Sequence, residues 1–576
     1  MVKKIISRFK KNLSMSGVLP DISYSKWIKD CEPQLFTTNK LPSFKPLLTI
    51  VVPAFNTPDK YILPLIYSLI EQKYPNWQLC LADGSTDPLR AMAIKSASGK
   101  DSRIQYIKLK RNLGIAGNTN EGSKLARGEY IAFVDHDDTL SPHALMEVVK
   151  LLNKRPNAEI IYSDEDKLSD DGKSRLLPFF KPDWSPSLLE GVNYMPHFLV
   201  IKKRLFDSVG GLRLGFDGAQ DYDLLLRITE KTKKIYHIPK ILYHWRMAAG
   251  STARAIGEKK YADDAGQRAL TEHIKRQNIK ANVVAIEDRP TNYRLQYTLP
   301  KNAKASIIIP FRDKVEYLKK LIPTIIKNSN GVNFEIILIS NNSVEQKTIK
   351  YLQNATRISP KIKIYKFDKP FNFSAINNFG RSKATGNYLV FLNNDTEVLT
   401  DNWLEELIGV AAQKNTGAVG PMLLYPDTRI QHAGVILGMK TMAGHVFRLR
   451  KEDELTPFGL ASWPRNYLAV TGACLVVSVQ KFDEIGGFDE KMIVAGSDVA
   501  LCIKLYEKGY QMVYWPFVKL VHYESVTVGT YDNGIIGDYN RSLTYYTPYL
   551  DWKDPYFNQN LDLMNESVDL RSKYEE

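Results

Sequence analysis

Hydrophobic segments of strand length alternate with longer amphipathic segments along this chain, and most of them end at proline or a polar residue. Residues 48–53 (LTIVVP) and 305–310 (ASIIIP) begin two such series. Continuous apolar runs of this length are typical of strands buried on both faces. The pattern predicts helices at about 60–72 and 314–328, and further strands at 77–83, 103–109, 128–138, 334–340, 361–367 and 386–396. Strands and helices in alternation predict mostly parallel sheets with helices on both faces.

The two series are copies of one another. Pro53 and Pro310 are 257 positions apart, and Gly128 and Gly386 are 258 apart. The match continues where residues 197–213 parallel 473–489 and residues 219–228 parallel 496–505. A nearly constant offset over such lengths indicates an internal repeat.

The repeat predicts an α/β protein with two tandem domains, each a Rossmann-like, mostly parallel sheet. We place a basic, helical N-terminal segment at 1–46, the first domain at 47–255, a helical closing segment and linker at 256–303, the second domain at 304–530, and a C-terminal tail at 531–576.

Acidic residues follow the fourth predicted strand of the first copy. Ligands of parallel sheets bind at the carboxyl ends of the strands, and Asp135, Asp137 and Asp138 stand at such an end. Carboxylates that lie close together repel unless a cation or a proton intervenes, and oxygen ligands favour Mg²⁺ or Mn²⁺. A divalent ion there would bridge a diphosphate. The alternative is a surface acidic turn or a helix cap.

Two further polar residues stand at the ends of predicted elements. Asp221 begins an apolar helix, and a carboxylate in that place is suited to act as a general base. The alternative for Asp221 is a helix cap or a partner of the helix dipole. His244, in ILYHWR, ends a strand-like run, where it would complete a metal shell or serve the structure alone.

The order of these motifs resembles the family 2 glycosyltransferases of GT-A fold. In the first copy the motifs are IVVPAFN, LADGSTD, FVDHDD, GAQDYDLLLR and YHWR, spread over about 47–252. In the second they are SIIIPFRD, FNFSAINNFG, FLNNDTEVL, QHAGVILG, TGACLVVS, GGFDE and HYES. Together they resemble bacterial tandem-domain enzymes that build surface polysaccharides such as O-antigen, capsule or rhamnose-rich glycans.

The resemblance implies a nucleotide pocket in the first copy. Pro53, Phe55 and Asp83 would line its nucleoside part, and Asp135 would contact the ribose.

The resemblance also implies the chemistry. Asp137 and His244 would hold Mn²⁺ or Mg²⁺, and Asp221 would deprotonate the acceptor hydroxyl. Members of this family usually invert the anomeric centre by direct displacement, which needs one base and an electrophilic clamp on the diphosphate.

The second copy keeps part of this set. Asp395 and His522 correspond to the metal ligands, and Asp498 corresponds to the base. The nucleotide-binding positions are Pro310, Ser340 and Asn393, so serine replaces the aspartate of the nucleoside turn and NND replaces the DxD pattern. Either this copy is a second transferase, or it is a degenerate copy kept for acceptor binding or packing.

One segment of the second copy contains two histidines outside these motifs. We interpret residues 428–448, which contain His432 and His445, as a loop on the acceptor side and not as a metal site.

Charge and composition limit the binding partners and the cellular location that we expect. The chain is 44% hydrophobic and 24% charged, which is a globular balance, and its net charge is +15. No nucleic-acid module accompanies that charge, and no CxxC pair occurs among the four cysteines. No apolar run approaches the roughly 18 residues of a membrane span. We therefore expect a cytoplasmic protein. Residues 1–13 form a basic amphipathic pattern that fits either an anionic inner membrane face or an ordinary packed helix.

The function predicted from these observations is transfer of a hexosyl or deoxyhexosyl unit from a UDP- or dTDP-sugar to a glycan or lipid-linked oligosaccharide. The alternatives are a two-domain polymerase of glycosaminoglycan type, one active domain beside a non-catalytic binding domain, and a scaffold without activity. A scaffold has no need of Asp137, Asp221 and His244 in this order.

Overall fold

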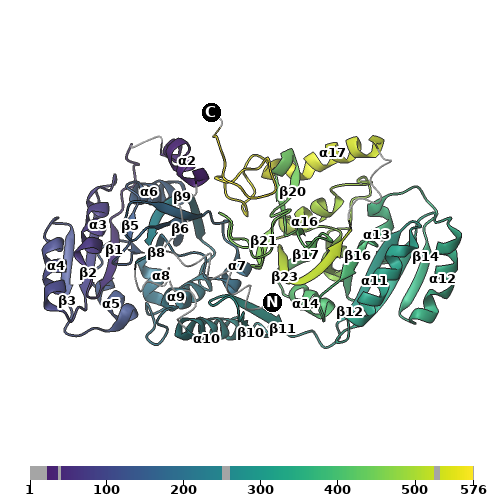
Figure 1. The fold of residues 1–576 in the computed structure, drawn as a ribbon, viewed down its shortest axis with the longest axis horizontal. Coiled ribbons are helices and arrows are strands. Elements are labelled where there is room, and N and C mark those ends of the chain that lie inside the picture. Colours follow the sequence, from purple (N-terminus) through teal and green to yellow (C-terminus); the bar gives the residue numbers. More distant parts are fainter. Residues whose placement is uncertain (1–21, 37–39, 249–259, 524–531, 575–576) are drawn as a thin grey trace.

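The computed structural model describes residues 22–36, 40–248, 260–523 and 532–574. Within them the chain forms two large mixed sheets, one in each half, flanked by helices (Figure 1). The strand order is β3-β2-β1-β4-β8-β6-β9-β5 in the first sheet and β14-β13-β12-β15-β22-β17-β23-β16 in the second. These orders are the same position by position, so the predicted repeat and α/β fold are confirmed. Residues 1–13 lie outside the described residues.

The first sheet mixes parallel and antiparallel pairs, and β6 and β9 pair in parallel beyond the antiparallel strand β8. β1 pairs in parallel with β2 and β4, whereas β8 runs antiparallel to β4 and β6. The strands are β1 Leu48–Ala54, β2 Trp77–Asp83, β3 Ile104–Lys108, β4 Tyr130–Phe133, β5 Thr139–Leu140, β6 Ile160–Leu168, β7 Arg175–Phe179, β8 Leu199–Lys202 and β9 Ile235–Arg246.

The second sheet repeats this arrangement. Its strands are β12 Lys304–Phe311, β13 Asn333–Ser340, β14 Ile362–Lys366, β15 Tyr388–Leu392, β16 Thr396–Val398, β17 Thr416–Leu424, β18 Ile430–His432, β21 Arg465–Tyr467, β22 Cys474–Ser478 and β23 Gln511–His522. A separate hairpin, β19 Val435–Leu437 with β20 Ala443–His445, lies beside it.

Helices connect the strands. In the first half they are α2 Ile22–Asp30, α3 Asp59–Ile70, α4 Pro88–Ser98, α5 Gly114–Ser123, α6 Ala144–Lys154, α7 Pro186–Gly191, α8 Lys203–Ser208, α9 Gln220–Thr229 and α10 Lys260–Arg276. In the second half they are α11 Val315–Lys327, α12 Gln346–Ile358, α13 Phe373–Lys383, α14 Trp403–Ala411, α15 Val479–Glu484, α16 Ser497–Glu507 and α17 Asp532–Tyr546. Short 3₁₀ turns lie at Glu32–Leu35, Met439–Thr441 and Thr547–Tyr549.

The halves are joined by buried polar contacts. An antiparallel pair, β10 Ala281–Ala285 with β11 Tyr293–Tyr297, follows α10 within the predicted linker. The Oγ of Ser185, just before α7, donates to Asn466 Oδ1 of β21 at 3.0 Å. The side chain of Asn558, in the C-terminal segment, donates to the buried carboxylate of Asp164 on β6 at 2.9 Å. The tail therefore packs against the first sheet.

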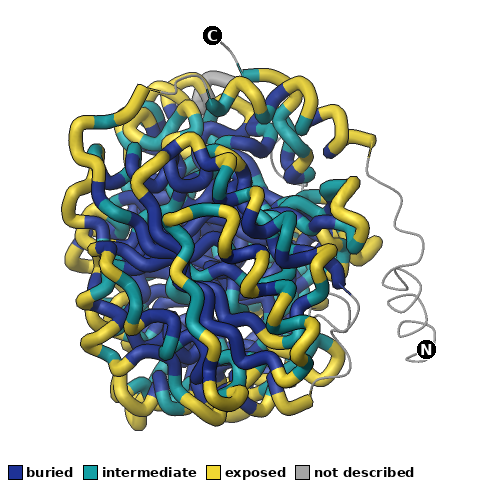
Figure 2. The backbone as a smooth tube through the Cα atoms, turned by 90° about the vertical axis from the view of Figure 1, so that its left-hand side faces the viewer, coloured by how far each residue is buried: buried dark blue, intermediate teal, exposed yellow. Residues whose placement is uncertain are grey.

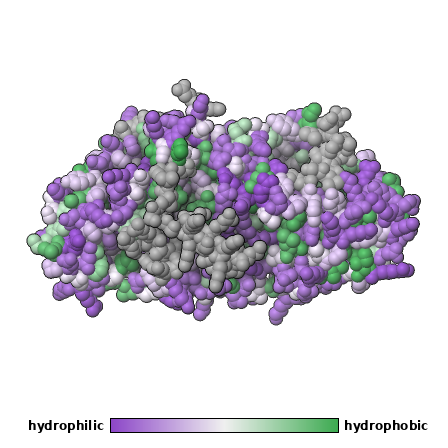
Figure 3. Space-filling model, viewed as in Figure 1, coloured by the Kyte–Doolittle hydropathy of each residue, from purple (hydrophilic) through white to green (hydrophobic). Residues whose placement is uncertain are grey.

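Burial follows the sheets. Figure 2 shows buried backbone running through the centre of the molecule, with exposed segments around it. The face in Figure 3 is mainly hydrophilic, with hydrophobic side chains in small separate groups. In the part of the chain that the structure describes, no helix is both long and apolar enough to cross a membrane.

Candidate active sites in the two copies

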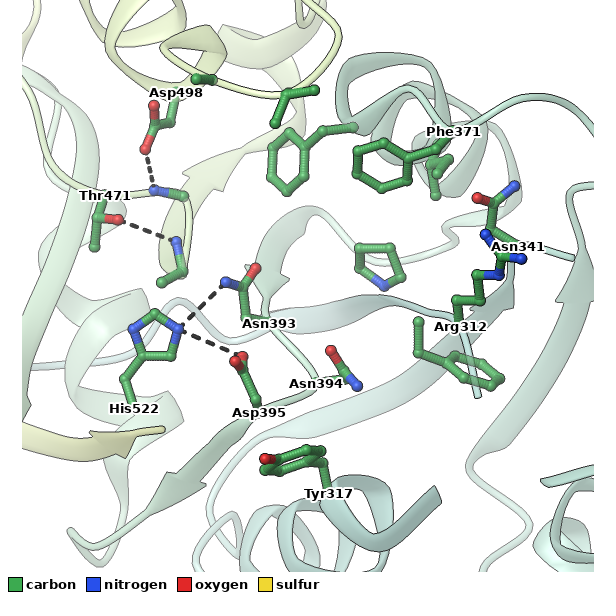
Figure 4. Close-up of a pocket in the computed structure, with 18 of the residues that line it drawn as sticks. Arg312, Tyr317, Asn341, Phe371, Asn393, Asn394, Asp395, Thr471, Asp498 and His522 are labelled. Atoms are coloured by element: carbon green, nitrogen blue, oxygen red, sulfur yellow. Dashed lines mark hydrogen bonds and ion pairs between the residues drawn. The ribbon is translucent and has the colours of Figure 1, made fainter. Parts of the chain in front are cut away.

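The second copy contains a cavity of about 700 Å³ at the carboxyl ends of its parallel strands. Its lining includes Pro310, Asn393, Asp395, Asp498 and His522. The fold thus brings together five of the six residues predicted for this copy. In Figure 4, Asp498 lies at one end of the cavity, Arg312 and Asn341 lie at the other, and Asn393 and Asp395 lie between them.

Asp498 stands at the start of α16. Its Oδ2 accepts the Gly472 N–H at 2.7 Å, and its Oδ1 accepts the Val499 N–H at 2.8 Å. These two bonds hold the carboxylate in one orientation at the start of the helix. Each oxygen keeps a second lone pair, so the group remains able to accept a proton from a hydroxyl in the cavity.

His522 and Asp395 form a pair in the middle of the cavity. His522 Nε2 lies 3.4 Å from Asp395 Oδ1 and 3.5 Å from Asn393 Nδ2. The other ring nitrogen of His522 is buried and has no hydrogen-bond partner. A carboxylate and an imidazole nitrogen at this separation suit a divalent ion completed by phosphate oxygens.

At the far end of the cavity, Asn341 takes the place predicted for Ser340. Ser340 is buried at the end of β13 opposite Phe311, and the next residue, Asn341, lines the cavity. The Nδ2 of Asn341 donates to the carbonyls of Phe367 and Lys369 at 2.8 and 2.9 Å. Those bonds hold the Asn341 amide in one orientation.

The first copy has a much smaller cavity at the corresponding place. About 70 Å³ is enclosed by residues that include Pro53, Asp135, His197 and Asp221. Burial raises the pKa of both Asp135 and Asp221. Asp221 accepts from Asn193 Nδ2 at 3.1 Å and from the Tyr222 N–H at 2.8 Å.

His197, which the sequence analysis did not single out, belongs to this smaller cavity. Its ring stacks on Tyr243 at 4.6 Å and lies 5.1 Å from the Trp245 ring. The pairings Phe133 with Leu199 and Phe391 with Leu475 make Ala473 the equivalent position in the second copy. An imidazole therefore takes up space where the second copy has a methyl group.

The two histidines predicted as metal ligands are not in equivalent positions. His244 pairs with Thr139 across β5 and β9, whereas His522 pairs with Thr396, which corresponds to Asp138. A shift of one residue turns a strand side chain to the other face. His244 therefore lies on the opposite face of β9 from Tyr243 and Trp245.

The partners of His244 agree with that placement. Its Nδ1 lies 2.6 Å from Asp166 Oδ1, and Asp166 also accepts from Arg175 and Tyr24. Burial alone would raise the pKa of Asp166, but the His244 ring and the Arg175 guanidinium outweigh it and lower that pKa. The pairing leaves Nε2 as the nitrogen of His244 available to a ligand.

The remaining predicted residues of the first copy have mixed environments. Asp83 is fully buried and accepts from the Ser85 N–H and the Tyr106 hydroxyl, both at 2.8 Å, while Phe55 is exposed. Asp138 accepts from the Tyr243 hydroxyl and the Arg246 N–H, so its role is structural. The carbonyl of Asp137 accepts from Arg246 Nε at 2.7 Å.

Among the described residues, no group of three or more His, Cys, Asp or Glu side chains is placed to bind an ion together. A metal in these sites would therefore depend on the oxygens of the substrate.

Comparison with known proteins agrees with the repeat. The model of the family described as glycosyl transferase family 2 matches residues 49–210 and 306–485. The chain is 39% identical over 555 residues to the O-antigen biosynthesis protein RfbC of Myxococcus xanthus, covering 95% of this chain and 43% of that protein. It is 38% identical over 535 residues to an uncharacterized protein of Sinorhizobium fredii, covering 92% and 59%. The chain thus spans about half the length of these relatives.

More distant matches cover part of the chain. The chondroitin synthase of Pasteurella multocida is 29% identical over 200 residues, which is 34% of this chain and 20% of that one. Among solved structures, GalNAc-T7 with UDP, GalNAc and Mn²⁺ is 16% identical, with a TM-score of 0.37 over 44% of this chain and 49% of that chain. The family model covers more than half of the chain, so this protein belongs to glycosyl transferase family 2.

Proposed function

We propose that the second copy transfers a hexosyl or deoxyhexosyl unit from a UDP- or dTDP-sugar to a glycan or lipid-linked oligosaccharide of a bacterial surface polysaccharide. The observation that carries this proposal is the 700 Å³ cavity in which Asp498 and the Asp395–His522 pair lie together. A cavity of that size is in the range of small-molecule sites. The O-antigen relative supports the class of product.

The proposed reaction is a direct displacement with inversion. Asp498 takes the proton of the acceptor hydroxyl while that oxygen bonds to the anomeric carbon, and the bond from this carbon to the diphosphate oxygen breaks. The Gly472 and Val499 N–H groups hold the Asp498 carboxylate in place during this step. The nucleoside would lie toward Arg312 and Asn341, at the far end of the cavity.

A divalent ion fits this site. Asp395 and His522 would hold Mn²⁺ or Mg²⁺, and the ion would stabilise the negative charge of the leaving diphosphate. The buried, unpartnered Nδ1 of His522 leaves Nε2 as the nitrogen directed at Asp395.

The first copy is the second candidate transferase. Asp221 has the same kind of backbone anchoring as Asp498, and two bases in one chain are what a polymerase of two alternating sugars requires. The partial similarity to chondroitin synthase favours that alternative. The small volume around Asp221 leads us to assign the donor reaction to the second copy first.

The proposal is tested on the full chain with a panel of UDP- and dTDP-sugars and Mn²⁺. We expect nucleotide release with one or more donors. Asp498→Asn should abolish release while leaving nucleotide binding, because the amide cannot accept the proton. Asp427→Asn, at an exposed ion pair with Arg429, is the control. Full activity of Asp498→Asn together with loss in Asp221→Asn would move the reaction to the first copy.

A further inference from the structure

A groove adjoins the 700 Å³ cavity of the second copy, which we call the donor cavity. It has a volume of about 350 Å³ and lies between the β19–β20 hairpin and α17. The groove and the donor cavity share His445, Ala495, Gly496 and Asp498 in their linings. Asp498 therefore stands on the wall between two cavities, with access to both.

We propose that this groove, which we call the α17 groove, binds an uncharged terminal sugar of the acceptor and presents its hydroxyl to Asp498. The proposal rests on the transferase function proposed above. A displacement with inversion needs the acceptor oxygen on the side of the anomeric carbon away from the leaving diphosphate. Asp395, His522 and Arg312 line the donor cavity and not the α17 groove, so the groove supplies that opposite side.

The lining of the α17 groove suits a neutral saccharide. Tyr539 is 48% exposed and offers an aromatic face, and Val435 and Met442 add apolar surface. Ser542 and His445 add hydrogen-bonding groups. Aromatic and apolar surface with a few polar groups matches the C–H and O–H faces of a sugar ring.

The charges in the α17 groove argue against a phosphate. Its described lining contains no Lys or Arg. The carboxylate of Asp538 is occupied, because it accepts the N–H groups of Ile493, Val494 and Ala495 at 2.7, 2.6 and 2.9 Å. An anionic ligand would find no compensating cation here. We therefore infer that the diphosphate of a lipid-linked acceptor would lie outside the α17 groove.

The wall between the cavities is fixed by α17. Besides the three bonds of Asp538, the Tyr546 hydroxyl donates to the Gly496 carbonyl at 3.0 Å. Gly496 has φ +75°, and a Cβ there would lie 2.6 Å from the Tyr546 oxygen. The segment that leads into Asp498 is thus held against α17 with little room to shift.

The test uses the full chain, a donor found active in the panel, and methyl glycosides of neutral hexoses and 6-deoxyhexoses as acceptor probes. Stimulated nucleotide release reports the acceptor, and release without glycoside reports the donor site. Tyr539→Ala removes the aromatic face, and Ala443→Trp fills the α17 groove. We expect both to raise the KM for the glycoside by about ten-fold or more while the KM for the donor stays within about two-fold.

The control is Tyr67→Ala, which removes a tyrosine that is 46% exposed on α3. It should change neither KM. An unchanged glycoside KM in Ala443→Trp, or donor hydrolysis that no neutral glycoside stimulates, would overturn the α17 groove assignment. Stimulation by glucose 1-phosphate and not by neutral glycosides would overturn the inferred lack of charge. Absence of nucleotide release from every donor would instead contradict the proposed function.

Discussion

One position differs in side-chain size between the two candidate sites. His197 lines the cavity of about 70 Å³ in the first copy, and Ala473 lines the cavity of about 700 Å³ in the second. The surrounding predicted residues correspond: Pro53 with Pro310, Asp135 with Asn393, and Asp221 with Asp498. The first copy keeps more of the family's acidic residues, yet it has less room around them.

We expect nucleotide binding to change in opposite directions when the residue types at positions 473 and 197 are exchanged. Ala473→His places an imidazole in the donor cavity and should weaken nucleotide binding by about ten-fold or more, because a bulky ring in a packed site excludes ligand volume. His197→Ala should enlarge the first cavity and allow nucleotide binding when the second copy is blocked by Ala473→His. Isothermal titration of the full chain with UDP and dTDP measures both. Unchanged binding in Ala473→His would show that side-chain volume at position 473 does not limit nucleotide binding.

Activation by a divalent ion should depend on Asp395. Asp395→Asn should weaken the Mn²⁺ activation of nucleotide release by about 10- to 100-fold, as loss of a ligand or of its support commonly does. EDTA should stop the reaction, and Mn²⁺ or Mg²⁺ should restore it. Asp427→Asn again serves as the control. Activity that resists EDTA would exclude the Asp395–His522 pair as a metal site.

The positions of most strands followed from the hydrophobic pattern. Residues 77–83 were predicted as a strand and form β2, and 48–53 and 305–310 fall inside β1 and β12. The exceptions are 128–138 and 386–396, where β4 ends at Phe133 and β15 ends at Leu392, and each is followed by a separate short strand, β5 or β16. The pair β10–β11 was missed, since two five-residue strands that are only partly buried resemble a linker.

The sites were predicted less completely than the elements. Asp221 and His244 are 23 positions apart, while Asp498 and His522 are 24 apart. That one-residue difference changes which face of the strand each histidine occupies, but only the strand pairing reveals it. His197 had a sequence signal, because it stands opposite Ala473 in the repeat, although a lone histidine beside a strand is commonly structural.

At the scale of elements, α17 should control turnover through one carboxylate. Asp538→Ala leaves three backbone N–H groups without their acceptor, which costs about 1–3 kcal/mol for each group that stays buried. The segment leading to Asp498 should loosen, so we expect kcat to fall by about ten-fold or more while nucleotide binding is kept. Asn540→Ala, at an exposed position of the same helix, should have wild-type kcat. Equal kcat in both variants would show that α17 does not position Asp498.

At the scale of the whole molecule, the C-terminal segment and the first sheet meet at a buried junction. Asp164 is fully buried on β6 and accepts from the side chains of Asn558 and His237 and from the Lys181 N–H. Asn558→Ala removes one of these donors and should lower the free energy of unfolding by about 1–3 kcal/mol. Gln559→Ala, at the neighbouring position, should have little effect. Urea denaturation followed by tryptophan fluorescence compares the two variants.

The same junction should make stability depend on pH. The His237 ring lies 2.8 Å from Asp164 and 3.2 Å from Asp183. Burial alone would lower the pKa of His237, but these carboxylates outweigh it and raise the pKa to about 9. A histidine in the unfolded chain titrates near pH 6.5. The folded chain therefore binds this proton more tightly, so its stabilisation is complete below about pH 6.5 and is lost as the pH rises through about 9.

We expect the free energy of unfolding of the full chain to fall by on the order of 3 kcal/mol between about pH 7 and pH 9.5. The urea midpoint should fall with it. His237→Gln can still donate one hydrogen bond to Asp164 but cannot take up a proton, so its midpoint should be lower at pH 7 and should vary less over this range. The difference between the two curves isolates the histidine from the other groups that titrate there. Parallel curves for the wild type and His237→Gln would mean that the charge on His237 does not hold the C-terminal junction together.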